Sequence, residues 1–227
     1  MSEHGPSVVE TKQPWIWQDG AITDPGSATI PVTDHGFLYG DSVYETIRTY
    51  GARPFALGSH LDRLDRSAAA IGLRIPMDRA RLAEAIEQVI DARPERSEVG
   101  IRLMVTRGIG PIGLDISLCR TPRVIMIGWS ISPGRHPMAE VGVSVVVSSI
   151  RRNPPNALNP HIKSGNFLNN ILAYREAREQ GAFEAILLTT ENTVAEATTS
   201  NVFWIRDGEV RSSTDEGILL GVTRSHL

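Results

Sequence analysis

The chain has 227 residues, of which 41% are hydrophobic and 22% are charged, a composition typical of a soluble globular protein with one large or two modest domains. Its formal net charge of -3 gives no reason to expect nucleic acid or an anionic membrane surface as a partner. The apolar runs are far shorter than the about 20 residues that span a bilayer, and the N-terminus has no features of a secretory signal.

The cysteine and histidine content bears on the cellular compartment and on metal binding. One cysteine, Cys119, excludes an intramolecular disulfide and fits a reducing compartment, so we expect a cytoplasmic protein. The six histidines are scattered, and no Cys/His cluster has the spacing of zinc ligands. We therefore expect no metal site.

The first half of the chain predicts a domain of mixed strands and helices over residues 15–129, after a polar and flexible segment at 1–14. The strand-like runs are β-branched or aromatic and are followed by turn residues; they lie at 15–17, 43–50, 101–106 and 123–129. Apolar residues at helical spacing predict two helices, one from Ser59 to a stop at Gly72 and one from the N-cap Asp78 through Ile90.

The second half predicts a further domain over 141–227, joined by a Pro- and Gly-containing linker at 130–140. Strands are expected at 141–150, 184–189 and 201–206. A helix over 166–180 would place Phe167, Ile171, Tyr174 and Ala177 on related turns. The whole pattern predicts an α+β fold.

Lysine is unusually rare in this chain. Of the 23 basic residues only Lys12 and Lys163 are lysines, and the rest are arginines. A guanidinium stays protonated and is a poor nucleophile, so only these two side chains can form an imine with an aldehyde cofactor. Lys12 lies in a polar segment without apolar neighbours, whereas Lys163 lies between a Pro-rich loop and a strong helix. Lys163 is the better candidate.

The cofactor that this chemistry suggests is pyridoxal 5′-phosphate (PLP), which has three physical requirements. It needs a lysine amine, an acid beside its pyridine nitrogen, and donors for a phosphate dianion. Glu196, in a segment of small residues, is a candidate acid. Arg63 and the loop Gly221-Val222-Thr223-Arg224 are candidate phosphate donors.

Five segments in matching order resemble the class IV aminotransferases, the PLP enzymes of fold type IV. They are Tyr39-Gly40-Asp41-Ser42-Val43-Tyr44-Glu45-Thr46-Ile47-Arg48, His60-Leu61-Asp62-Arg63-Leu64, Ile162-Lys163-Ser164-Gly165-Asn166-Phe167-Leu168, Glu196 to Phe203, and Gly217 to Arg224. The resemblance implies a smaller N-terminal domain, a larger β-rich C-terminal domain that binds PLP, and a homodimer.

The resemblance also implies roles for individual residues. Lys163 would carry PLP as a Schiff base and transfer protons, and Glu196 would pair with the pyridine nitrogen. Arg63 and the backbone of Val222 and Thr223 would hold the phosphate. Two further residues would lie at the cofactor, Leu219 against the ring and Thr199 beside it. Four would line the substrate pocket: Tyr39, Tyr44, Arg48 and Arg102.

The loop after Val105 resembles the branched-chain aminotransferases most. D-amino acid aminotransferases place an arginine and a histidine near this loop, where Ile112 and Leu114 stand here. The expected reaction is therefore transfer of an amino group from an L-amino acid to 2-oxoglutarate. We expect the amino acid to be a branched-chain one. Aminodeoxychorismate lyase and D-amino acid aminotransferase are alternatives, and a PLP-binding protein without catalysis is another.

Three departures from the family pattern bear on these expectations. Phe167 stands where branched-chain enzymes usually have a tyrosine that donates to the cofactor, and Gly100 replaces a pocket tyrosine of some members. Family members also usually continue for about 50–60 residues beyond Arg224, within an ordinary domain size. The sequence therefore predicts a C-terminally incomplete PLP domain, with impaired cofactor retention as one consequence.

Overall fold

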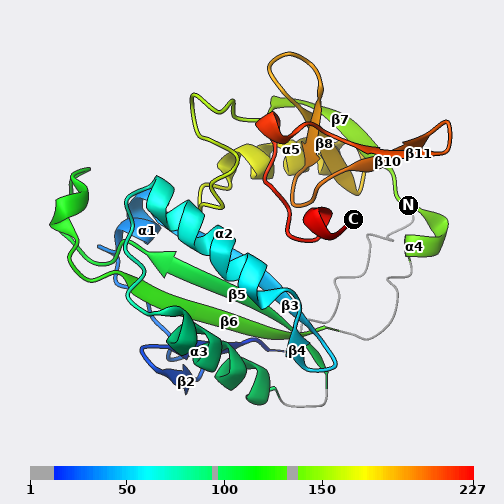
Figure 1. The fold of residues 1–227 in the computed structure, drawn as a ribbon. Helices are drawn as coiled ribbons and strands as arrows, with labels where there is room; N and C mark the ends of the chain where they lie inside the picture. The colour runs from blue at the N-terminus through cyan, green and yellow to red at the C-terminus, as the bar shows by residue number, and fades with distance from the viewer. Residues whose placement is uncertain (1–12, 94–96, 132–137) are drawn as a thin grey trace, which may run out of the picture. The chain divides into compact units, whose positions relative to one another are not determined.

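The structure, a computed structural model, describes residues 13–93, 97–131 and 138–227. The predicted flexible segment up to residue 12, with Lys12, and residues 132–137 of the predicted linker lie outside these ranges. The chain groups into two compact units (Figure 1). Unit 1 comprises Met1–Leu61 and Leu73–Gly134, and unit 2 comprises Asp62–Gly72 and Arg135–Leu227. The domain limits 15–129 and 141–227 stay a prediction.

Unit 1 is built on an antiparallel sheet. Among the described residues its six strands lie in the order β2-β1-β6-β5-β3-β4. In chain order the elements are β1 (Trp15–Gln18), β2 (Ala21–Thr23), α1 (His35–Tyr39), β3 (Ser42–Tyr50), β4 (Arg53–Pro54), α3 (Arg79–Asp91), β5 (Glu98–Thr106), the 3₁₀ helix η1 (Ile116–Leu118) and β6 (Arg123–Ile131). The four strands predicted for this half are confirmed as β1, β3, β5 and β6.

The core of unit 1 follows from strand alternation. On β5, Val99, Ile101, Leu103 and Val105 point to one face and are fully buried. Helix α3 packs on β1, β5 and β6, with the side chain of Asp78 accepting from Arg81 N as its N-cap (2.9 Å). The other face of β3 and β5 therefore carries the side chains that do not enter this core.

Helix α2 (Leu57–Ala70) belongs to both units, because the grouping changes at Asp62. It begins two residues before the predicted start at Ser59, and Gly72, with φ +60°, follows its end as predicted. Its second half supplies the buried side chains of Arg63 and Ser67 to unit 2. These two residues are four apart and so lie on one face of the helix.

Unit 2 contains a three-stranded sheet and a hairpin in its described part. Its elements are α4 (Met138–Val141), β7 (Val145–Arg151), α5 (Leu168–Glu179), β8 (Glu184–Leu188), β9 (Val194–Ala197), β10 (Phe203–Arg206), β11 (Glu209–Ser212) and the 3₁₀ helices η2 (Asp215–Gly217) and η3 (Arg224–His226). Strand β8 lies between β7, its parallel neighbour, and β9, its antiparallel neighbour. Helix α5 connects β7 to β8, as a parallel pair requires.

One prediction for this half needs correction. The strand predicted from Val141 begins at Val145, because Val141 ends helix α4 and Gly142 (φ +76°) turns the chain. The helix predicted over 166–180 is observed as α5, in which Ala177 is buried while Ile171 and Tyr174 are 56% and 43% exposed. The buried face is made of alanines, which lets the helix approach β8 closely.

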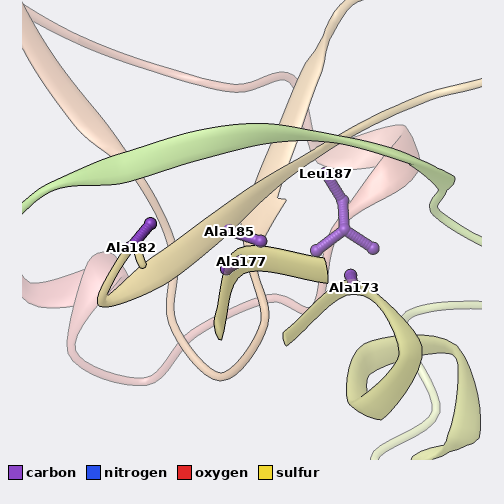
Figure 2. Packing of buried hydrophobic residues seen from close by; sticks show 5 residues of the cluster. All are labelled: Ala173, Ala177, Ala182, Ala185 and Leu187. Atoms are coloured by element: carbon purple, nitrogen blue, oxygen red, sulfur yellow. The ribbon is translucent and has the colours of Figure 1, made fainter. Parts of the chain in front are cut away.

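Figure 2 shows this alanine cluster between α5 and β8. It consists of Ala173, Ala177, Ala182, Ala185 and Leu187, with Val146 and Ile150 of β7 packed against it. Alanine differs little from polar residues in hydrophobicity, so the sequence pattern does not mark the alanine face as the buried one.

Candidate active site

Glu196 lies where strand β9 is irregular. The register pairs Ile186 with Ala197 and Leu188 with Val194, so three steps on β9 face two steps on β8. One extra residue in a strand is a β-bulge, which re-aims side chains. Ala195, Glu196 and Ala197 are all buried in succession, which regular strand alternation would not allow at an open sheet face. The bulge therefore turns the glutamate inward.

The buried carboxylate of Glu196 has three donors. Arg152 Nε lies 2.7 Å from Oε1, Leu219 N donates to Oε2 (2.9 Å), and Asn201 Nδ2 lies 3.4 Å from Oε2. Burial raises the pKa of the Glu196 carboxyl, and the Arg152 charge is the strongest influence that opposes this rise. The positive charge of Lys163 opposes it as well.

The loop from Gly217 to Thr223 is held against Glu196 by its backbone. Asn201 Nδ2 donates to Leu219 O (2.9 Å), so one amide contacts both the loop and the carboxylate. A Cβ atom at Gly221 would collide with Oδ1 of Asn201. Glycine at this position therefore permits the close approach.

Two arginines anchor the same loop. The buried Arg63 of α2 donates from Nη1 to Leu220 O (2.9 Å). Arg224 pairs with Asp215 (2.8 Å) and donates to Ser213 O (2.9 Å). Val222 is buried, and Thr223 precedes the short 3₁₀ helix η3. The loop that was predicted to bind the phosphate is thus held in place by the contacts of Arg63 and Arg224.

Lys163 lies in the irregular segment between β7 and α5. Its backbone N–H donates to Ser67 Oγ of α2 (3.1 Å), and Ser67 is 1% exposed. Its side chain is half-buried. Helix α2 therefore contacts the lysine segment through Ser67 and the loop through Arg63, one turn apart.

Unit 2 thus brings together six of the residues that the sequence indicated: Arg63, Lys163, Glu196, Leu219, Val222 and Thr223. Lys163 supplies an amine. Glu196 supplies a buried carboxylate that accepts hydrogen bonds from Arg152 and Leu219, and Arg63 supplies a guanidinium that contacts the loop. These are the three requirements of PLP, so the donor set fits this cofactor.

Thr199 also belongs to unit 2. It lines an open pocket of about 380 Å³ with Phe167, Tyr174 and Phe183, among other residues of α5 and β8. Thr199 is exposed, whereas the neighbouring Thr198 is buried and donates to Glu184 (2.6 Å). Its apolar and aromatic lining residues are Phe167, Ile171, Tyr174 and Phe183, and the other lining residues are polar or charged.

Three of the predicted substrate residues share one face of β3 and β5 in unit 1. The Arg102 guanidinium lies over the Tyr44 ring at 3.9 Å, a cation–π arrangement, and Arg48 lies over Tyr50 at 4.3 Å. The register sets Arg102 opposite Thr46, two residues from both Tyr44 and Arg48. These side chains form a basic and aromatic surface.

The fourth, Tyr39, ends helix α1. Its hydroxyl accepts from Gly113 N (3.2 Å), and its ring meets His35 edge-on at 5.0 Å. Tyr39 therefore contacts the glycine-rich loop, in which Ile112 and Leu114 are more than four-fifths exposed.

Sequence reasoning missed three residues of the site in unit 2. Arg152 is one of two adjacent arginines, and nothing in the local pattern distinguishes it from Arg151. Ser67 contacts the site only through tertiary placement, whereas Asn201 lies within the Glu196 to Phe203 segment but has no role in the sequence prediction. Within the described ranges there is no group of His, Cys, Asp and Glu that could hold a metal ion and no helix long and apolar enough to cross a membrane.

Comparison with known proteins finds relatives that are aminotransferases or a related lyase. A protein of Methanocaldococcus jannaschii, provisionally named a branched-chain-amino-acid aminotransferase, is 36% identical over 210 residues (92% of this chain and 72% of the relative). An aminodeoxychorismate lyase of Bacillus subtilis is 33% identical (92% and 71%). A D-alanine aminotransferase of Bacillus licheniformis is 31% identical (91% and 71%).

A solved structure agrees with these relatives. The branched-chain amino acid aminotransferase of a T.th. strain, with pyridoxamine 5′-phosphate, matches with a TM-score of 0.87 and 32% identity, over 93% of this chain and 71% of that one. The family model "Amino-transferase class IV" matches residues 42–227. This chain therefore belongs to the class IV aminotransferases and has their mixed α/β fold of type IV.

Proposed function

We propose that this class IV aminotransferase transfers the amino group of a branched-chain L-amino acid to 2-oxoglutarate, with PLP carried on Lys163. The observation that supports the cofactor site is the Glu196 carboxylate, which is buried in unit 2 and receives Leu219 N–H at 2.9 Å. A buried acid near Lys163 and beside a braced loop fits a pyridinium ring with its phosphate.

The residues of unit 2 divide the work on the cofactor. Glu196 would hold a proton on the ring nitrogen, and Arg63 with the backbone of Val222 and Thr223 would bind the phosphate. Leu219 would contact the ring, and Thr199 would lie beside the cofactor. Lys163 would hold the cofactor covalently and would move a proton to and from the substrate. When bound, PLP supplies the electron sink for cleavage of a bond at the substrate Cα.

For the substrate, we assign the carboxylate of the incoming acid to the basic surface of β3 and β5. Arg102 lies over Tyr44 and Arg48 lies on the same face, so two guanidinium groups belong to this surface. Tyr39 provides a further contact. Ile112 and Leu114, apolar where a D-amino acid enzyme would have charged residues, favour a branched apolar side chain.

The neighbouring activities separate by product. L-leucine, L-isoleucine, L-valine and D-alanine would each be assayed with 2-oxoglutarate, and aminodeoxychorismate would be assayed for release of pyruvate. The proposal expects glutamate from the branched-chain L-amino acids at the highest kcat/KM. D-alanine as the preferred donor, pyruvate with an aromatic amine, or PLP binding without turnover would each contradict it. Lys163→Arg is the control, because arginine cannot form the imine.

We further infer a cytoplasmic homodimer. The single cysteine, Cys119, is buried and unpaired, which suits a reducing compartment. The dimer follows from the family resemblance. Light scattering with the PLP-loaded protein tests it, since a monomeric mass would contradict it.

A further inference from the structure

Arg152 pairs directly with the acid of the proposed cofactor site, and neither the motifs nor the proposed function gives it a role. Its Nε lies 2.7 Å from Glu196 Oε1, and the two side chains are 12% and 6% exposed. A pair this buried and this short is a strong charge-assisted hydrogen bond.

The position of Arg152 is fixed by the sheet. Its backbone N–H donates to Leu188 O (2.9 Å) directly after β7, while Glu196 lies on β9. Strand β8 lies between them, so the two side chains meet across it. Arg152 Nη1 is also directed at Asn169 Oδ1 (3.4 Å), and Asn169 is itself held by Arg151 O (2.9 Å). The guanidinium is thus oriented from the strand and from α5.

We propose that Arg152 is a positioning residue that keeps Glu196 ionised and directs the remaining lone pair of its Oε1 toward the ring nitrogen of the cofactor. This inference rests on the proposed function. Each carboxylate oxygen accepts one strong bond from the protein, Oε1 from Arg152 and Oε2 from Leu219. Oε2 also accepts the longer bond from Asn201 Nδ2 (3.4 Å), so the second lone pair of Oε1 is the one that can accept the ring N–H.

The charges around Glu196 determine how the removal of Arg152 changes the pKa of the Glu196 carboxyl. Among the described residues, Arg152 and Lys163 are the charged groups that lower the pKa of the carboxyl, and Leu219 N–H and Asn201 contribute hydrogen bonds. Burial raises the Glu196 pKa and Arg152 is the main opposing influence, so without Arg152 the pKa rises further. The ionised carboxylate that the ring requires is then populated only at higher pH.

The test measures PLP affinity as a function of pH. In Arg152→Met the affinity should be weaker at neutral pH and should recover as pH rises, with about a tenfold loss for each pH unit by which the profile moves. Arg152→Lys retains the charge and should keep the wild-type profile. Arg151→Met is the matched control, because it removes a charge at the adjacent position, where the side chain contacts Asn192 instead (2.8 Å).

A second readout uses the apo protein, in which the Glu196 carboxyl carbon is followed by NMR and assigned with Glu196→Gln. Its titration should move to higher pH in Arg152→Met, and in Arg152→Gln if the methionine variant does not fold. A profile identical to that of Arg151→Met would overturn the inference. Wild-type protein that takes up no PLP on Lys163 would instead overturn the proposed function, so the two failures are distinct.

Discussion

Gly221 shows how one residue controls the proposed site. A Cβ atom there would meet Asn201 Oδ1, and Asn201 contacts both Glu196 and Leu219. We expect Gly221→Ala to displace the amide and to weaken PLP binding about tenfold, since loss of a hydrogen bond to a buried charged group costs about 1.5–3 kcal/mol. Gly58→Ala is the control, because nothing lies within 4 Å of its Cβ. Equal PLP affinity in both variants, measured by fluorescence titration, would contradict this role.

Much of the proposed site could be named from residues alone. Lys163 stood out because only two lysines exist, and Arg63 and Glu196 stood out through motifs. Arg152 and Ser67 could not be named, because their contacts depend on the bulge in β9 and on the face of α2 that meets the lysine segment. Such contacts join residues 44 and 96 positions apart, which no local pattern encodes.

Helix α5 is positioned at the element scale by small side chains. Ala177 is fully buried against β8 (Figure 2), so a larger residue would push the helix from the strand. We expect Ala177→Leu to destabilise the protein by about 1–3 kcal/mol. Ile171→Ala, at a site 56% exposed on the same helix, should change stability by less than about 0.5 kcal/mol. Urea unfolding measures both, and equal midpoints would be inconsistent with the observed helix face.

Glu176 joins the same helix to β7 and makes this contact sensitive to pH. It accepts from Ser148 Oγ (2.6 Å) and Ser149 N (2.9 Å), which lower the pKa of its carboxyl. A lowered pKa in the folded state contributes stability above the unfolded value of 4.5, and this is lost as pH falls through the folded value.

We therefore expect Glu176→Gln to cost about 1 kcal/mol at neutral pH, after allowance for solvent exposure. The difference from wild type should shrink as pH falls below about 4.5. Glu179→Gln removes an exposed charge from the same helix, with side-chain exposure of 65%, and should show little effect at any pH. Thermal unfolding across this pH range decides the matter, and a constant difference would contradict the linkage.

The elements themselves were predictable where composition or hydrophobic period was clear. β1, β3, β5 and β6 are rich in β-branched or aromatic side chains, and α3 has both a cap and an apolar stripe. β9 was missed because its four residues include a bulge with three consecutive buried positions. The start of β7 was misplaced because Val141 has strand propensity although it ends α4.

At the scale of the molecule, the proposed chemistry divides between the two units. The residues assigned to the cofactor lie in unit 2, and the basic and aromatic surface assigned to the substrate lies in unit 1. Arg102→Met should therefore raise the KM for 2-oxoglutarate by about tenfold or more while PLP affinity stays unchanged, because it removes one charged contact. A parallel loss of PLP affinity, measured by titration, would show that Arg102 serves the cofactor instead.

The central claim is that PLP is carried on Lys163. The protein would be loaded with PLP, reduced with borohydride, digested and mapped by mass spectrometry. We predict a phosphopyridoxyl adduct on the peptide that contains Lys163, and its absence from Lys163→Arg. An adduct on Lys12 alone, or no adduct in protein that is folded and loaded, would contradict the claim.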